Sequence, residues 1–201
     1  MTDITRRIPN GHPVWPGDTP YAFEFTWKIG EGSSVNVGKI ITTTHLGTHL
    51  DAPYHYDENG GKLETIPLST LIGGCRVVDA KGRGVLDADF VRGLGDLPER
   101  VLFCSGQPDA WHSFPKTFMH VSPAAVEVLA TRGVKLFGTD APSVDALDSK
   151  DLPGHKAFAK AGIYIVEGLA LSKVKPGDYE LIVLPLRLEG ADASPVRAIL
   201  R

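Results

Sequence analysis

The stretch "HLGTHLDAPYHY", residues 45–56, holds three of the seven histidines in the chain. Four of its residues can bind a metal and are separated by even offsets: His45, His49, Asp51 and His55. A helix would turn Asp51 about 240° away from His45. A straight strand would put both on one face but roughly 20 Å apart. We therefore expect the chain to curl after the preceding strand into a strand-end loop, with Gly47 and Pro53 shaping it so that the side chains converge.

Imidazole and carboxylate groups in such a cluster suit zinc and its first-row neighbours. Three ligands and an open position are typical of a catalytic site, where the metal acidifies bound water and polarises a carbonyl group. His55 follows Pro53 and stands apart from the other three residues. The spacing leaves two interpretations of His55 open, a fourth ligand or a general acid/base.

Composition narrows the class of protein. The 201 residues carry a formal net charge of -3 with no run of Lys or Arg, so nucleic acid and anionic membranes are not expected partners. The sequence contains no apolar run long enough for a membrane span and no apolar segment near "MTDITRRIPNG" typical of a secretory signal. We expect a cytoplasmic protein with Cys75 and Cys104 as buried, reduced thiols.

Short runs rich in β-branched and aromatic residues predict seven strands. They lie at residues 21–29, 35–44, 75–80, 100–105, 134–140, 162–168 and 179–188. A helix is predicted at 122–133, with Ser122 as N-cap and Gly133 after its end. Further helices are predicted at 85–94 and around 155–161. The pattern indicates one β-rich α/β domain spanning residues 1–201.

Two more candidate ligands lie in the second half of the chain, His155 and Glu167. Glu167 interrupts an apolar strand, where a carboxylate is costly unless it is paired or binds a metal. The segment "DAPSVD" (140–145) follows a strand and admits two interpretations, support for the site from behind its ligands or a turn and helix cap.

Residues 45–56 match the pattern HxGTHxDxPxH, and through it the chain resembles the metal-dependent cyclase-like hydrolases. The likeness covers almost the whole chain, including "PVWPGDT" (13–19), "VNVG" (35–38), "LPGH" (152–155) and "VEGLAL" (166–171). Residues 13–19 and 35–38 resemble the bacterial formamidases of this superfamily, whereas residues 106–120 match least well. The resemblance implies a swivelling β/β/α fold, in which a mixed sheet curls toward a barrel and carries a few helices.

The same resemblance implies a site with two zinc ions per subunit, or with manganese or another divalent ion. His45 and His49 would bind one ion, Asp51 and Glu167 would bridge both, and His155 would complete the second. His55 would be the acid/base, Trp15 would contact the ring of the substrate, and the protein would be a homodimer. The remaining histidines are interpreted as structural or surface residues: His12, His112 and His120.

The reaction that the resemblance implies is hydrolysis of a linear amide. N-formyl-L-kynurenine would be converted to L-kynurenine and formate in tryptophan breakdown. One alternative is a related hydrolase of a cyclic amide of the isatin kind, with manganese as its candidate ion. Trp15 and residues 35–38 favour the formamidase. The other is a non-catalytic metal- or ligand-binding protein, which the intact set of six polar residues disfavours.

Overall fold

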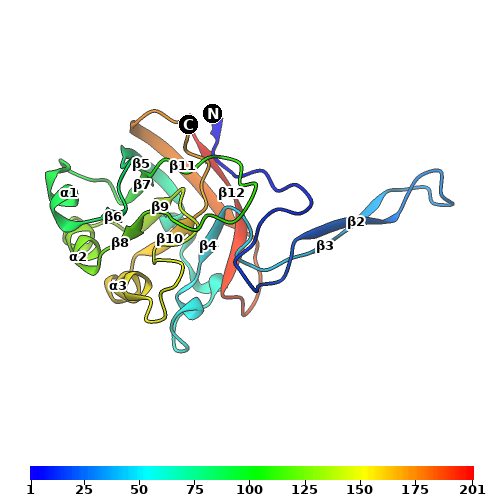
Figure 1. The fold of residues 1–201 in the computed structure, drawn as a ribbon, viewed down its shortest axis with the longest axis horizontal. Helices are drawn as coiled ribbons and strands as arrows, with labels where there is room; N and C mark the ends of the chain where they lie inside the picture. Colours follow the sequence, from blue (N-terminus) through cyan, green and yellow to red (C-terminus); the bar gives the residue numbers. More distant parts are fainter.

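Seven strands form a closed, barrel-like sheet in the computed structural model, which describes residues 1–201 (Figure 1). Around the ring, the order is β12 (Ala193–Leu200), β11 (Gly177–Pro185), β5 (Ile72–Asp79), β7 (Arg100–Cys104), β9 (Leu136–Thr139), β10 (Tyr164–Glu167) and β4 (His49–Asp51). The pairing of β4 with β12 closes the ring, and β1 (Thr2–Asp3) extends β12. Strands β5, β7, β9 and β10 run parallel and the other pairs antiparallel. The expected mixed sheet curled into a barrel is confirmed.

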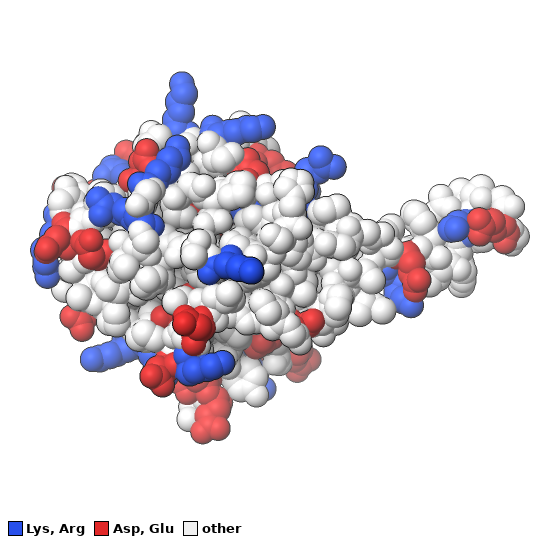
Figure 2. All heavy atoms as spheres, in the orientation of Figure 1, with Lys and Arg blue, Asp and Glu red and all other residues white.

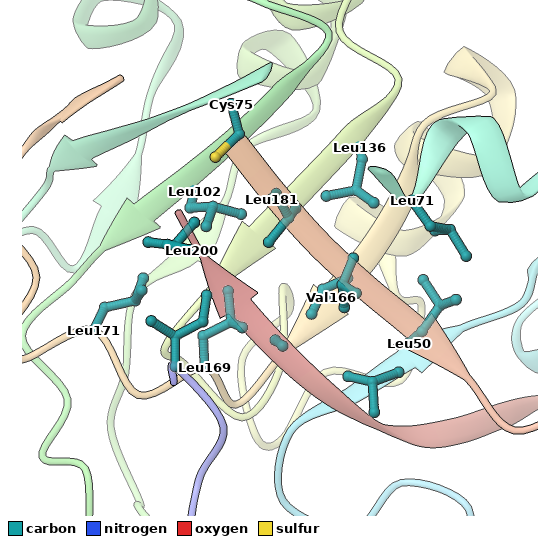
Figure 3. Close-up of a cluster of buried hydrophobic side chains, with 14 of the residues drawn as sticks. Leu50, Leu71, Cys75, Leu102, Leu136, Val166, Leu169, Leu171, Leu181 and Leu200 are labelled. Carbon is teal, nitrogen blue, oxygen red and sulfur yellow. The ribbon is translucent and has the colours of Figure 1, made fainter. Parts of the chain in front are cut away.

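The barrel is filled by small and branched apolar side chains, many of them leucines (Figure 3). Leu50 from β4, Val166 from β10 and Leu181 from β11 all point into this core. Residues on either side of them in each strand point outward, because side chains alternate across a strand. This alternation places the neighbours of Leu50 and Val166 on the outer surface of the barrel, where the polar residues of interest lie.

Three helices cover one outer side of the barrel: α1 (Ala88–Gly93), α2 (Pro123–Thr131) and α3 (Pro153–Ala161). They enclose a second apolar cluster that includes Phe103, Phe137 and Phe158. The predicted start of α2 is confirmed, because the Ser122 hydroxyl accepts a hydrogen bond from the Ala125 amide at 3.2 Å. None of these helices is long enough to cross a bilayer.

Strands β2 (Ala22–Trp27) and β3 (Val37–Ile41) form a separate hairpin that extends away from the barrel (Figure 1). Strands were expected in both places, but they pair only with each other. A small parallel pair, β6 (Val85–Leu86) and β8 (His120–Val121), lies beside the helices.

Two predictions need correction. Residues 85–94 do not form one helix: Val85 and Leu86 are a strand, and Asp87 caps α1, which begins at Ala88. Residues 45–56 are not simply a strand-end loop after β3, because His49–Asp51 form strand β4 of the barrel itself. The even spacing of this stretch therefore reflects, in part, a real strand face.

Candidate metal centre and active-site cavity

The outer faces of β4 and β10 supply the centre of the site. His49 and Asp51 flank the core residue Leu50 on β4, and Glu167 follows the core residue Val166 on β10. The two strands pair with Glu167 opposite His49. The three polar side chains consequently share one outward face, and each is at most 3% exposed.

Five of the predicted site residues converge there. His45 approaches from the turn before β4, and His155 from the first turn of α3. The Asp51 Oδ1 atom lies 3.1 Å from His45 Nδ1 and 3.4 Å from His49 Nε2, whereas its Oδ2 atom lies 3.7 Å from His155 Nε2. Glu167 divides its oxygens in the same way, with Oε2 3.4 Å from His49 Nε2 and Oε1 3.7 Å from His155 Nε2. Each carboxylate thus has one oxygen facing His49 and the other oxygen facing His155.

The rings of His45, His49 and His155 each have one nitrogen facing away from Asp51 and Glu167, and this outer nitrogen has a hydrogen-bond partner. His49 Nδ1 lies 3.1 Å from the Gly47 carbonyl oxygen. The other two partners are carboxylates, Asp192 at 3.0 Å from His45 Nε2 and Asp145 at 2.7 Å from His155 Nδ1. Protons held on these outer nitrogens leave the inner nitrogens free to donate electron pairs to a metal.

The surroundings of Asp51 test whether these residues fit a cation. Both of its carboxylate oxygens are buried, and neither accepts a hydrogen bond of good geometry, although imidazole nitrogens lie 3.1 to 3.7 Å from them. A buried carboxylate without partners is strongly destabilising, so these two orphaned oxygens require a positive charge. Nitrogen and oxygen donors on this face form the ligand set that zinc and its first-row neighbours prefer.

The protonation of the cluster agrees with that requirement. Burial opposes a charge on His45, but its hydrogen bond to Asp192 and the nearby carboxylate of Asp51 outweigh burial and raise its pKa to about 10. Burial likewise opposes a charge on His155, and its contacts with Asp145 and Asp51 raise its pKa to about 10. Burial and the neighbouring charge of Asp51 raise the pKa of Glu167. Protons and a metal ion would therefore compete for the nitrogen and oxygen atoms of this cluster.

His55 ends a short turn that follows β4, and its ring lies 4.0 Å from the ring of His45 and 5.9 Å from that of His155. A third of the side chain, 33%, is exposed. Burial lowers the pKa of His55 to about 4; the charge of Asp51 opposes this effect, and His45 and His155 add to it. At neutral pH the imidazole is uncharged and able to accept a proton.

A cavity of about 320 Å³ opens onto this cluster. Its walls include Trp15 and Phe114, whose rings meet edge to face at a centroid distance of 5.3 Å. Trp111 and Leu152 add further apolar surface, and Asp18 contributes a carboxylate away from the metal-facing group. The cavity thus offers an aromatic slot beside a polar, metal-binding floor.

Residues 106–120, which matched the family pattern least well, supply part of this wall. Arg6 holds the segment, since its guanidinium lies 3.7 Å from the Trp111 ring centroid and donates a hydrogen bond of 2.5 Å to the Pro108 carbonyl. The Trp111 ring stacks on His12, which is buried. The structural interpretation of His12 is confirmed, and His112, exposed at the surface, lies outside the metal-facing cluster.

Two glycines allow the strands and loops of the site to approach. Gly47 has a φ of +61° and Gly168 a φ of +67°, so both occupy the left-handed region. A side chain at Gly168 would collide with the Gly47 carbonyl. The predicted role of Gly47 in bending the chain is confirmed, whereas the matching demand on Gly168 was not predicted from the sequence.

Sequence reasoning also missed Asp192, Trp111 and Phe114. Asp192 directly precedes β12, a strand that was not predicted, and no local pattern connects it with His45 far earlier in the chain. Both interpretations of residues 140–145 are correct for Asp145, which lies behind a candidate ligand and also caps a helix. It supports His155 and also accepts hydrogen bonds from the Gly154 and His155 amides at the start of α3.

The family model "Cyclase: Putative cyclase" matches residues 2–146. The chain belongs to the cyclase family. A kynurenine formamidase from Geobacillus thermodenitrificans (strain NG80-2) is 44% identical over 201 residues, covering 99% of this chain and 96% of the relative. A second kynurenine formamidase, from Erythrobacter litoralis (strain HTCC2594), is 46% identical over 210 residues, covering 99% and 92%. The resemblance to the formamidase members of the cyclase family, expected from residues 13–19 and 35–38, is confirmed.

Solved structures agree with this assignment. A potential metal-dependent hydrolase with cyclase activity superposes with a TM-score of 0.84 at 33% identity, covering 99% of this chain and 96% of the other. Isatin hydrolase A from Labrenzia aggregata, bound to benzyl benzoate, has a TM-score of 0.80 at 24% identity, covering 99% and 92%. At this lower identity, the second comparison supports the fold alone.

Proposed function

We propose that this protein is a zinc-dependent kynurenine formamidase that hydrolyses N-formyl-L-kynurenine to L-kynurenine and formate. The observation that carries the proposal is the orphaned, buried carboxylate of Asp51, which lies behind the histidines and Glu167 that form the floor of an aromatic cavity. Such a floor needs a cation, and the cavity above it suits an aryl ring. The two formamidase relatives, similar over 99% of this chain, support the same substrate.

Five residues would hold the metal. The division of carboxylate oxygens supports two ions, with Asp51 and Glu167 as the bridging ligands. His45 and His49 would be further ligands of one ion, and His155 would be a further ligand of the other. Zinc is our choice because imidazole and carboxylate donors suit it, and manganese is the alternative ion.

When bound, the metal would acidify water and polarise the formyl carbonyl. His55 would accept a proton from the attacking water, since its low pKa keeps it uncharged at neutral pH. It would then deliver that proton to the aniline nitrogen, which is a poor leaving group as an anion. The oxygen of water would form a new bond to the formyl carbon while the C–N bond of the formamide breaks. The products would be formate and the free amine of L-kynurenine.

The cavity would recognise both ends of the substrate. Trp15 and Phe114 would hold the aryl ring, and aromatic pairs of this kind contribute about 1 kcal/mol beyond area burial. Asp18 would face the ammonium group of the amino-acid tail, because it is the cavity's one carboxylate outside the metal-facing cluster. We also expect the protein to act in the cytoplasm as a homodimer.

The test is turnover of N-formyl-L-kynurenine, followed by absorbance, before and after chelation and after the return of zinc. Turnover that chelation abolishes and zinc restores supports the proposal. A zinc-loaded protein that does not hydrolyse this substrate refutes it. Hydrolysis of isatin in its place would assign the cyclic-amide alternative.

A further inference from the structure

Leu152, directly before helix α3, has a backbone conformation that its own side chain opposes. Its φ of 46° and ψ of 55° lie in the left-handed region, and no other residue except glycine has a positive φ in this chain. A bulky residue with such a φ is a genuine outlier, and the following Pro153 favours an extended conformation instead. A functional role for the Leu152 side chain would explain why this strain is kept.

The start of α3 does not account for the leucine. Leu152 occupies the N-cap position, where no side-chain hydrogen bond caps the helix. Its backbone makes the local contacts, since its amide donates to Ser149 Oγ at 3.3 Å and its carbonyl accepts from the Lys156 amide at 3.0 Å. Glycine or asparagine would adopt the same conformation with less strain. The leucine side chain therefore serves something other than the helix.

The half-buried side chain of Leu152 lies between two spaces. It lines the active-site cavity of about 320 Å³ and also a second hollow of about 730 Å³. His55 is the only other residue that lines both. Leu152 and His55 thus form a partition between the active-site cavity and the second hollow.

The second hollow has the chemistry of a hydrated surface. Its walls include the charged side chains of Asp57, Glu58, Lys150, Asp151 and Lys156. Figure 2 shows charged side chains of both signs along the lower edge of the visible face, where the cyan segment after β4 lies in Figure 1. Walls of this kind do not suit the aryl ring of a substrate. A small group could still extend into the hollow if the partition were removed.

The partition lies at the metal-facing end of the cavity. Leu152 is the N-cap of α3 and His155 its third residue, positions whose side chains meet across the first turn. Trp15 and Phe114 form the aromatic wall instead. An amide carbon has three substituents in one plane. With its oxygen over the metal ligands and its nitrogen toward the aromatic wall, the third substituent points toward Leu152.

We propose that Leu152 restricts the reaction to formyl amides by occupying the space into which a larger acyl group would extend. This inference rests on the proposed formamidase activity and concerns the acyl half of the substrate. In a formyl amide the third substituent is a hydrogen atom, which fits against the Leu152 side chain. In an acetyl amide it is a methyl group, which would collide with that side chain.

Hydrolysis of formanilide and acetanilide by the zinc-loaded protein tests this selectivity. Leu152→Gly removes the partition, and glycine adopts the left-handed conformation freely. We expect the ratio of kcat/KM for formanilide to kcat/KM for acetanilide to fall at least roughly tenfold, the lower end of what one methylene contributes to discrimination in a pocket. Leu152→Asn also tolerates this conformation and nearly keeps the side-chain size, so it should keep the wild-type ratio.

Phe114→Leu is the matched control at the aromatic wall. It enlarges the same cavity away from the partition, so it should slow both anilides alike and leave the ratio unchanged. An unchanged ratio in Leu152→Gly would overturn the proposal. An equal fall in Leu152→Asn or Phe114→Leu would also overturn it, because the size of the Leu152 side chain would then not be the cause.

Binding of formate and acetate to the zinc-loaded protein tests the partition without turnover. Calorimetric titration should show that the affinity for acetate relative to formate rises roughly tenfold in Leu152→Gly and stays at the wild-type value in Leu152→Asn. The same relative affinity in wild type and Leu152→Gly would contradict a size limit at Leu152. A protein that shows these binding preferences but hydrolyses neither anilide would refute the proposed activity alone.

Discussion

Asp145 accepts a hydrogen bond from the His155 ring at 2.7 Å while also accepting the Gly154 and His155 amides at 2.7 and 3.0 Å. One carboxylate therefore fixes both the first turn of α3 and the orientation of the imidazole that this turn carries. Burial raises the pKa of Asp145, but its bonds to His155 and Gly154 outweigh burial and hold that pKa below its usual value. Asp145 consequently keeps its charge and holds the outer His155 proton away from the metal-facing nitrogen.

Asp145→Asn should weaken metal binding by about 10- to 100-fold, the usual effect of removing a partner from a histidine ligand. The amide keeps the shape of the carboxylate but can turn its NH₂ group toward the ring and favour the wrong tautomer. Competition with a chromophoric chelator would measure the affinity. Asp89→Asn is the control, because Asp89 lies in the first turn of α1, its side chain is 92% exposed and its ion-pair partner is Arg92. Equal affinity in the two variants would exclude this positioning role for Asp145.

His55→Ala should lower kcat by about 10²- to 10⁴-fold, the usual contribution of an acid/base group, while the bound metal per chain stays unchanged. The wild-type base should be lost only as the pH falls through about 4, because protonation removes it below the pKa of His55. A bound cation would lower that pKa further. Steady-state rates and metal analysis would check both points. His112→Ala, which removes an exposed histidine, should have no effect on either. A loss of metal in His55→Ala would make His55 a ligand.

Asp18→Asn should raise KM for N-formyl-L-kynurenine roughly fivefold, for a partly exposed ion pair of about 1 kcal/mol. Formanilide carries the same scissile bond but no ammonium group, so its KM should stay the same. Glu58→Gln removes an exposed carboxylate outside this cavity and serves as the control. A parallel rise in KM for both substrates would mean that Asp18 shapes the cavity and does not bind the ammonium group. An unchanged KM for both would mean that Asp18 does not take part in substrate binding.

Local sequence patterns predicted those features that local chemistry decides. The cap of α2 at Ser122, the bend at Gly47 and the convergence of His45, His49 and Asp51 all follow from residues close together in the chain. Contacts that closure of the barrel creates could not be predicted in this way. Asp192 meets His45 only because β12 pairs with β4, although the two residues are 147 positions apart in the sequence.

The hairpin formed by β2 and β3 illustrates a different limit of prediction from local sequence. Runs rich in β-branched and aromatic residues correctly predicted strands near 21–29 and 35–44, but such a composition indicates only that the strand packs against something. It does not specify which surface that is. In this chain β2 and β3 do not join the sheet of the barrel, so apolar residues of these two strands are among the most exposed apolar side chains of the protein.

Cys75 and Cys104 are free, buried thiols, as predicted, and they should not react with a disulfide reagent in the native protein at pH 8. Burial raises the pKa of Cys75 to about 12 and that of Cys104 to about 11, and the thiolate is the reactive form. Ellman's reagent should therefore detect two thiols only after unfolding. Asn59→Cys, on an exposed loop, should add one thiol that reacts at once in the folded protein.

Because both pKa values are raised by folding, the stability that these thiols contribute is full below about pH 9 and declines as the pH rises above it. Rapid native reaction of two thiols, or unfolding free energies that do not fall between pH 9 and 11, would contradict this account of the barrel core.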